Sequence, residues 1–298
     1  TEKQFESDIA AALLSPAGGY TRNVDCYDPK LGLFVDTLIR FVQKTQPNEW
    51  AFFEKQNPVN PVRKFCTAFN NADGLLSVLR YGFKHRGRRF RVCYFQPESA
   101  LNQKDAQSYA QNEITCNRQW FYSDTTHNSV DMVLAVNGIP VFAFELKNQF
   151  TGQTVENAKQ QWMHDRDPRE VCFQFNKRIL GYFCVDLTEV WMATRLAGKD
   201  TRFLPFNQGS NGAGRDGGLQ DGKTLIFPRY HQLDVVRKLV ADVRQKGAGQ
   251  HYLIQHSAGS GKSNSIAWTA YRLASLFNTE NKPVFASVIA VSYTHLTL

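Results

Sequence analysis

The sequence lacks the features that mark membrane, secreted and repeat proteins. No apolar run reaches the roughly 18 residues that suggest a membrane span. The first residues, TEKQFESDIAAALL, contain no basic start and no apolar core of the kind that a signal peptide has. No segment of the chain repeats elsewhere. We therefore expect a protein without a membrane segment, located in the cytoplasm.

Closely spaced cysteine pairs are absent as well. The chain has six cysteines, and no two of them form the C-x-x-C spacing of a zinc site. Their scatter also argues against a disulfide framework, so we expect reduced thiols. They are Cys26, Cys66, Cys93, Cys116, Cys172 and Cys184.

The composition that remains is typical of a folded globular protein. The 298 residues allow one large domain or two ordinary ones with a sizeable core. A hydrophobic fraction of 42%, with 22 phenylalanines and 11 tyrosines, argues against disorder. The formal net charge of +8 permits nucleic-acid binding. It does not establish such binding, because surface lysines also keep proteins in solution.

Hydrophobic spacing divides the chain into helices and strands on both sides of a glycine-rich segment. Residues 207–222 hold six glycines and almost no apolar side chain, which indicates a flexible loop or linker. Before this segment, we predict helices at 3–14, 33–42, 61–79 (interrupted near residues 70–71) and 153–164, and strands at 88–95, 112–123 and within 182–194. After it, the pattern predicts a helix at 229–246, a strand at 252–255, a helix at 264–277 and a strand at 283–291.

The segment SVDMVLAVNGIPVFAFELKNQF predicts a β-hairpin that ends in charged residues. Two apolar runs flank Asn137-Gly138, which is a strong hairpin signal. With the turn there, antiparallel pairing sets Asp131 opposite about Phe144, next to Glu145. Glu145 and Lys147 are two residues apart, so they project to the same face of a strand. The pattern therefore predicts two carboxylates and a lysine close together at one end of a sheet.

Two close carboxylates repel each other unless a cation neutralises them. Ligands that are all oxygen suit Mg²⁺, which binds one or two carboxylates together with waters and a phosphate. Such a metal can acidify water and stabilise charge on a phosphodiester, and Lys147 would orient the water or counter that charge. The alternative is that Glu145 and Lys147 form an ordinary surface ion pair at a strand end.

This arrangement resembles the PD-(D/E)xK nuclease motif. More narrowly, the hairpin together with FESDI, GFKHRGRRFRVCYFQP and DRDPRE resembles the N-terminal nuclease domain of the restriction (R) subunit of type I restriction–modification enzymes. The resemblance implies a mixed sheet flanked by helices. It also implies a further catalytic glutamine, Gln161 or Gln160, and a supporting acidic residue at the metal site, Glu6. The tyrosine that the family usually has four residues after the glutamine is absent here.

A second group of chemically active residues, HSAGSGKS at 256–263, resembles a phosphate-binding P-loop of superfamily 2 helicases. His256 replaces the first glycine of the pattern, while Gly259, Gly261, Lys262 and Ser263 are all present. Backbone N–H groups around Ser260 would wrap the phosphates of ATP, Lys262 would neutralise their charge, and Ser263 would bind Mg²⁺. FPRYHQLDVV resembles the adenine-binding segment of these helicases, with contacts from Arg229 and Gln232.

The basic run at 84–91 is a third candidate. Its cations could contact phosphates, although it lacks the interleaved aromatic rings of a single-strand platform. The alternative is a solvated strand and turn. The residues are Lys84, His85, Arg86, Arg88, Arg89 and Arg91.

Nuclease followed by helicase motor is the order of the type I R subunit. We expect an endonuclease domain at 1–206, a linker at 207–228 and a truncated RecA-like P-loop αβ unit at 229–298. The resemblance implies Mg²⁺-dependent cleavage of double-stranded DNA coupled to ATP-driven translocation, in complex with modification (methyltransferase) and specificity subunits. Because no DExx box or second motor lobe follows, we expect a fragment that does not hydrolyse ATP usefully alone. The alternative is a P-loop nucleotide-binding module with a degenerate nuclease-like domain that only binds DNA.

Overall fold

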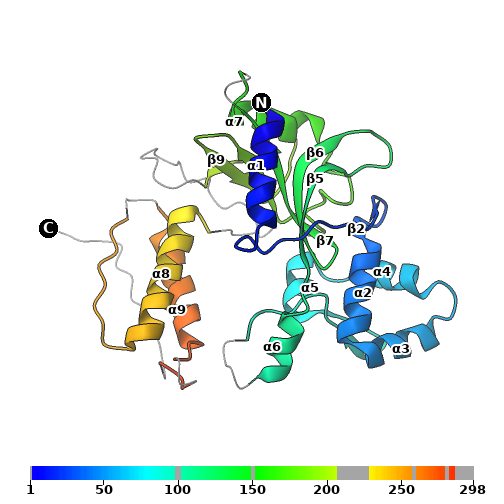
Figure 1. Ribbon diagram of the computed structural model, residues 1–298, viewed down its shortest axis with the longest axis horizontal. Coiled ribbons are helices and arrows are strands. Elements are labelled where there is room, and N and C mark those ends of the chain that lie inside the picture. Colours follow the sequence, from blue (N-terminus) through cyan, green and yellow to red (C-terminus); the bar gives the residue numbers. More distant parts are fainter. Residues whose placement is uncertain are drawn as a thin grey trace.

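A six-stranded mixed sheet with helices on both faces forms the centre of the computed structural model (Figure 1). The structure describes residues 2–97, 102–148, 152–206, 228–256, 260–278 and 282–285. A group of smaller helices lies at one end of the sheet, and two further helices form a pair to one side. None of the helices within these ranges is long and apolar enough to cross a membrane.

The sheet has the strand order β10-β9-β8-β7-β6-β5. All neighbours are antiparallel except β7 and β8, which run parallel. A parallel pair needs a crossover, and α7 (Val155–Gln160) with the π-helical turn η2 (Gln161–Asp165) lies within it. The strands are β5 (Ile114–Phe121), β6 (Ser129–Val136), β7 (Ile139–Leu146), β8 (Gly181–Val185), β9 (Val190–Ala193) and β10 (Leu204–Pro205).

The two faces of the sheet pack against different helices because side chains alternate along each strand. Met132 and Leu134 of β6 pack with the helix α1 (Glu2–Leu14). Val133, which lies between them, joins the cluster that contains Ala158 and Trp162 of α7 and η2. The sheet is therefore buried on both faces, as the continuous apolar runs of the hairpin predicted.

A separate aromatic core holds the smaller helices together. The ring of Phe65 lies 5.3–5.4 Å from the rings of Phe53, Phe83 and Phe90. These rings come from two helices and a short hairpin. The elements of this region are α2 (Val35–Thr45), α3 (Pro47–Gln56), α4 (Pro61–Asn70), α5 (Leu75–Tyr81), β3 (Phe83–His85) and β4 (Arg88–Phe90). Three short elements complete this half: β1 (Tyr27–Asp28), β2 (Leu33–Phe34) and α6 (Gln103–Tyr109).

Most predicted elements of the first 206 residues are present, with corrections. The helix predicted at 61–79 is two helices, broken where the sequence suggested. The strand predicted at 88–95 ends at Phe90. The helix α3 was missed, although Pro47 at its first position and Glu49 in its first turn are helix-start signals. The helix α6 was also missed.

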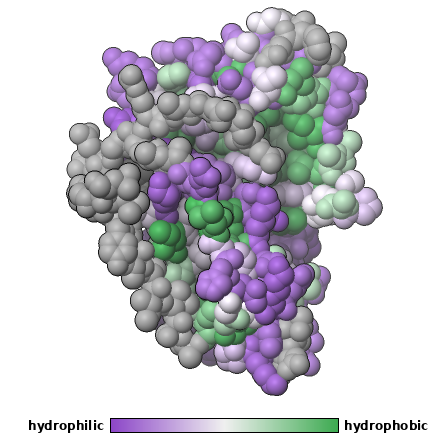
Figure 2. Space-filling view, turned by 90° about the vertical axis from the view of Figure 1, so that its left-hand side faces the viewer, coloured by the Kyte–Doolittle hydropathy of each residue, from purple (hydrophilic) through white to green (hydrophobic). Residues whose placement is uncertain are grey.

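The last part of the chain forms two helices without the predicted strand between them. α8 (Tyr230–Lys246) and α9 (Lys262–Ala274) pack through Val236, Val240 and Val243. Residues 252–255 are not a strand, which corrects the sequence prediction. A parallel strand needs neighbours for its backbone hydrogen bonds, and no described segment pairs with this one. Figure 2 looks onto this side of the molecule, where hydrophobic patches interrupt a hydrophilic surface.

Two predictions lie largely outside the described residues. The glycine-rich segment 207–222 is one of them. Of the strand predicted at 283–291, only 283–285 is described, with a single β-bridge between Phe277 and Pro283.

Candidate active site

The turn of the β6–β7 hairpin forms as the Asn-Gly pair predicted. Asn137 and Gly138 have φ angles of 50° and 79°, the left-handed values that a type I′ turn requires. The carbonyl oxygen of Gly138 accepts a hydrogen bond from the Phe34 N–H at 2.9 Å. This contact seats the turn on the start of α2, so the hairpin is fixed at the end opposite its charged residues.

A β-bulge along the hairpin brings the two carboxylates into register. The bulge shifts the pairing by one residue, so that Met132 pairs with Phe144. Continuing this register by one residue sets Asp131 directly opposite Glu145, where the sequence prediction had set it opposite about Phe144. Lys147 follows two residues after Glu145. The structure therefore assembles the predicted cluster. Because of the bulge, the two carboxylates face each other directly, which a regular hairpin would not give.

Backbone hydrogen bonds hold this cluster in place. One oxygen of Asp131, Oδ2, accepts the Leu146 N–H at 2.8 Å. The Lys147 Nζ lies 4.0 Å from the same oxygen. The Lys147 N–H donates to the carbonyl oxygen of Val185 at 2.8 Å. Glu145 and Lys147 are 1% and 3% exposed, which excludes the alternative of an ordinary surface ion pair.

Arg166 is a residue of this site that sequence analysis did not identify. Its Nε and Nη2 donate to Oε1 of Glu145 at 3.0 and 2.7 Å. Nη2 also donates to the carbonyl oxygen of Ser129 at 2.8 Å, and the guanidinium carbon lies 5.6 Å from the centre of the Tyr122 ring. Arg166 follows η2 directly, within DRDPRE. No spacing rule links it to a strand 21 residues earlier, so only the fold reveals the contact.

Burial dominates the electrostatics of Glu145. Loss of solvent raises the pKa of its carboxyl, Arg166 lowers it and the nearby charge of Asp131 raises it, and the net result is a pKa of about 8. The pKa of the Arg166 guanidinium is raised by the same carboxylate, against its own burial. The charge state of Glu145 therefore depends strongly on Arg166. A further positive charge nearby would favour the ionised carboxylate.

The predicted catalytic glutamine lies at the start of η2. Gln161 is partly buried, and its Oε1 is enclosed without a hydrogen-bond partner in the described part of the chain. Gln160 is exposed. Next to them, the buried Trp162 donates to the carbonyl oxygen of Phe183 at 3.2 Å and fixes η2 against β8. Of the two glutamines left open by the sequence, Gln161 is the one with a buried acceptor.

Glu6, which the resemblance assigns to the metal site, is held by hydrogen bonds to β5, and its part in metal binding stays a prediction. One of its oxygens accepts from Nε of Arg118 at 2.7 Å and the other from Nε2 of Gln119 at 3.1 Å. Among the described residues, no three histidine, cysteine, aspartate or glutamate side chains gather as a metal-binding group. Glu6 ties α1 to β5 from a position that is only 3% exposed.

The carboxylate pair nonetheless fits a hard divalent cation. Asp131 and Glu145 supply oxygen donors from facing positions. Arg166 uses only Oε1 of Glu145, which leaves Oε2 without a hydrogen bond within the described residues. Mg²⁺ is commonly bound by one or two carboxylates, with water and phosphate oxygens completing its shell.

The structure brings the two halves of the predicted nucleotide site together. Gln232 Nε2 donates to the carbonyl oxygens of Ser260 and Gly261 at 3.3 and 2.9 Å. Its Oε1 accepts the Arg229 N–H at 2.9 Å. Gly261, with φ of 79°, immediately precedes α9. Lys262 donates from Nζ to a backbone carbonyl at 3.4 Å.

The remaining residues of the predicted P-loop are Ser263 and Gly259. Ser263 is exposed in the first turn of α9. Gly259 lies outside the described residues, and ATP binding stays a prediction.

One known protein family matches a region of the chain that includes the β6–β7 hairpin. A search of the curated proteins returned no match to the chain. The family model described as type I restriction enzyme R protein N terminus matches residues 41–209, which is more than half of the chain and includes the whole of β5 to β10. Membership implies a nuclease-type enzyme of a restriction system that works with DNA and other subunits. The chain belongs to the family of type I restriction enzyme R protein N termini.

Proposed function

We propose that this chain cleaves double-stranded DNA at Asp131, Glu145 and Lys147 in a Mg²⁺-dependent reaction, as the nuclease part of a type I restriction–modification complex. The observation that supports this most is the register that opposes Asp131 and Glu145, with Lys147 beside them. Cleavage would be coupled to ATP-driven translocation, and the modification and specificity subunits would supply the DNA target.

Each residue has a distinct part in this proposal. When bound, Mg²⁺ would be held by the two carboxylates and would supply Lewis-acid stabilisation of a phosphodiester. The Leu146 N–H fixes Asp131, and Arg166 fixes Glu145. Lys147 orients the attacking water and counters negative charge on the phosphate. Water forms the new bond to phosphorus, one ester bond breaks, and the departing oxygen takes up a proton.

The P-loop supports a smaller part of the proposal. Gly261, Lys262 and Ser263 at the start of α9, with Arg229 and Gln232 beside them, would bind the phosphates and base of ATP. Without the strand at 252–255, the loop lacks its usual support. We therefore expect no useful ATP hydrolysis by the chain alone. Release of phosphate that rises when DNA is added would contradict this.

The test of the nuclease site is cleavage by the complex reassembled with its modification and specificity subunits. We expect Asp131→Asn and Lys147→Ala each to lower the cleavage rate by about 100-fold or more, as losses of charge-stabilising groups do. The matched controls are Asp105→Asn and Lys104→Ala, which change the same residue types on the exposed helix α6. DNA scission that survives either site variant would show that the site is wrongly assigned.

The ion pair between Arg166 and Glu145 also supports a second function. A guanidinium bound to Glu145 is what a degenerate, metal-free domain that only binds DNA would contain. Calorimetric titration with Mn²⁺ and Mg²⁺ separates the two functions. The nuclease should bind metal, and Asp131→Asn should weaken that binding. A degenerate site should give no heat of binding for either metal.

A further inference from the structure

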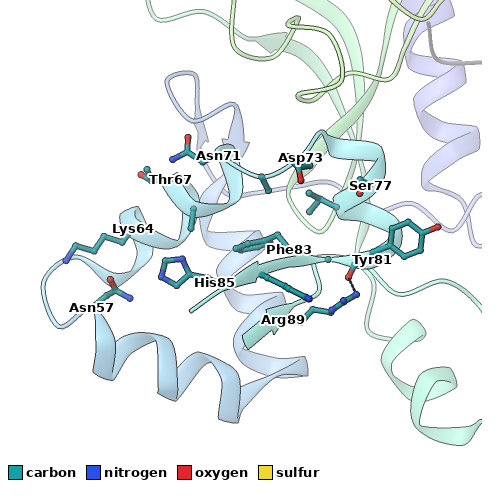
Figure 3. A pocket seen from close by; sticks show the side chains of 15 residues that line it. Asn57, Lys64, Thr67, Asn71, Asp73, Ser77, Tyr81, Phe83, His85 and Arg89 are labelled. Atoms are coloured by element: carbon teal, nitrogen blue, oxygen red, sulfur yellow. Dashed lines mark hydrogen bonds between the residues drawn. The ribbon is translucent and has the colours of Figure 1, made fainter. Parts of the chain in front are cut away.

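A polar groove lies in the helical half of the molecule, apart from the carboxylate pair. It has a volume of about 710 Å³ and is bounded by α4, α5 and the β3–β4 hairpin (Figure 3). Lys64 reaches it from α4, and His85 and Arg89 from the hairpin. Asp73 is the single acidic residue among the described residues that line it.

The region around this groove holds most of the net charge of the protein. Residues 47–91 contain nine lysines and arginines but only three acidic residues, a net charge of +6 out of +8 for the whole chain. Surface charges are normally of both signs and interspersed. A concentration of one sign on one module is the electrostatic footprint of a polyanion partner.

These cations are not neutralised by neighbouring carboxylates. Within the described ranges, none of the nine forms an ion pair. On α8, by contrast, Lys238 and Lys246 each bind an aspartate one turn away at 2.8 and 2.7 Å. The positive charge of the groove region is therefore available to an external partner.

The arginines of the hairpin are held in position but keep spare donors. Arg89 donates from Nη1 to the carbonyl oxygen of Tyr81 at 2.9 Å, and Arg86 from Nη1 to Oε1 of Gln56 at 3.1 Å. A guanidinium has five N–H groups, so each arginine retains donors for a phosphate. Arg86 and Gly87 form the two-residue turn between β3 and β4, with φ of 46° and 80°. The basic residues of the two short strands therefore lie close together at the end of the hairpin.

Most aromatic residues of this region are turned into the core, and Tyr81, which lines the groove and is 58% exposed, is the exception. Phe53, Phe83 and Phe90 are buried and pack on one another, so they do not offer faces on which bases could stack. Single-strand binding sites usually depend on such stacking. A single exposed ring, Tyr81, offers one stacking position at most, so the chemistry of the groove suits phosphates better than a run of exposed bases.

We propose that this groove binds the phosphate backbone of duplex DNA through Lys64, Lys84 and Arg89. The choice of duplex DNA rests on the nuclease function proposed above, while the phosphate chemistry rests on the groove itself. The turn of the β6–β7 hairpin is seated on the helical region, and Glu145 lies seven residues farther along β7. At about 3.3 Å per residue, Glu145 lies on the order of 20 Å from this turn, so the groove and the carboxylate pair are separate contact points.

The experiment compares two charge-matched variants of the full chain. K64Q/K84Q removes two exposed groove lysines, and K3Q/K199Q removes two exposed lysines outside the 47–91 region. Binding of a short fluorescent duplex is measured by anisotropy in EDTA, where metal-dependent cleavage cannot occur. Salt is varied between about 50 and 200 mM. Circular dichroism checks that both variants fold.

We expect K64Q/K84Q to lower the slope of log affinity against log salt by about 2, because each lysine–phosphate contact contributes about 0.9. The affinity that wild type loses over this salt range should shrink by about tenfold. K3Q/K199Q should match wild type. The groove assignment is overturned if both variants fall equally, if neither falls, or if wild type binds no duplex.

The Asp131→Asn variant separates this proposal from the nuclease function. It should bind duplex in EDTA as wild type does while losing cleavage in the complex. If groove variants lose binding but the wild-type complex cuts no DNA, the nuclease proposal fails and the groove stands. If Asp131→Asn loses cleavage and K64Q/K84Q binds normally, the groove proposal fails and the nuclease stands.

Discussion

Two segments of this chain carry sequence motifs of similar clarity, but only one has all the secondary structure that its motif requires. The hairpin at 129–147 has its turn, both strands and a buried charged cluster. The loop at 251–263 has its following helix but not its preceding strand. A hairpin strand finds its first partner a few residues away, whereas a parallel strand depends on partners that are distant in sequence. The comparison shows that the strand of a motif forms only where neighbouring strands are present to pair with it.

The same difference is visible in burial. Leu146 ends the strand β7 and is 1% exposed, while Leu253, in the middle of the predicted P-loop strand, is 95% exposed. Both are leucines in apolar runs, and both were assigned to strands. Only the first has a sheet around it and a helix, α1, packed upon it. Sequence patterns identify strand-forming segments but not whether neighbours are present.

The largest expected effect is on this pair of leucines. Leu146→Ala should lower the free energy of unfolding by about 2–5 kcal/mol, because it leaves a cavity in a packed core. Leu253→Ala should change it by no more than about 0.5 kcal/mol, as exposed substitutions do. Urea unfolding followed by circular dichroism measures both. Equal losses would show that residues 252–255 are packed in a sheet after all.

The second effect concerns buried and exposed cations. Arg166→Met removes both hydrogen bonds to Glu145 and should cost about 2–3 kcal/mol at neutral pH. Lys262→Met, at the exposed start of α9, should cost less than about 0.5 kcal/mol. E145Q/R166M should recover much of the loss, because a buried pair replaced as a unit is tolerated better than one broken. A single variant as stable as wild type would mean that the two hydrogen bonds of Arg166 to Glu145 contribute nothing to stability.

The loss in Arg166→Met should also grow with pH. In wild type, burial raises the pKa of Glu145 from 4.5 to about 8, so stability falls between these values as the unfolded carboxyl ionises and the folded one does not. Above pH 8 the wild-type carboxyl ionises against Arg166 and the fall stops. Without Arg166 the pKa rises further, so the deficit should widen by up to about 1.4 kcal/mol per pH unit above pH 8. Unfolding curves measured at several pH values around 8 follow this directly.

Two glycines with the same backbone angle give the third comparison. Gly138 and Gly261 both have φ of 79°. A Cβ on Gly138 would lie 2.4 Å from the backbone oxygen of Phe34, whereas on Gly261 it would meet the side chain of Gln232. We expect Gly138→Ala to cost about 2–3 kcal/mol and Gly261→Ala about 1 kcal/mol, since a left-handed alanine alone costs about 1–2.

Thermal denaturation measures both glycine variants. Gly138→Asn is the control, because asparagine tolerates this φ better than alanine but keeps the clash. If Gly138→Asn is as stable as wild type, then strain and not contact with α2 explains the cost at this position.

The sequence predicted the hairpin and its cluster because the necessary information is local. Asn137-Gly138 specifies the turn, and strand alternation then sets Glu145 and Lys147 on one side. The sequence could not predict contacts between residues that are far apart in the chain. Arg166 reaches the site only because the crossover helix returns along the sheet. Nor does a helix pattern say which partner, here Arg118, the side chain of Glu6 will meet.

The smallest expected effect is a difference in local stability between the two segments. The pair α8–α9 has four buried apolar residues in its core, while β6 and β7 are packed on both faces. Less apolar burial makes local opening easier. Backbone amides of α8 should therefore exchange with deuterium about 10–100-fold faster than those of β6. Amides of α2, which packs in the aromatic core, serve as the helical control and should match β6. Protection of α8 equal to that of β6 would mean that the P-loop half is as firmly built as the hairpin, and the contrast between the two segments would then lie only in the strand at 252–255.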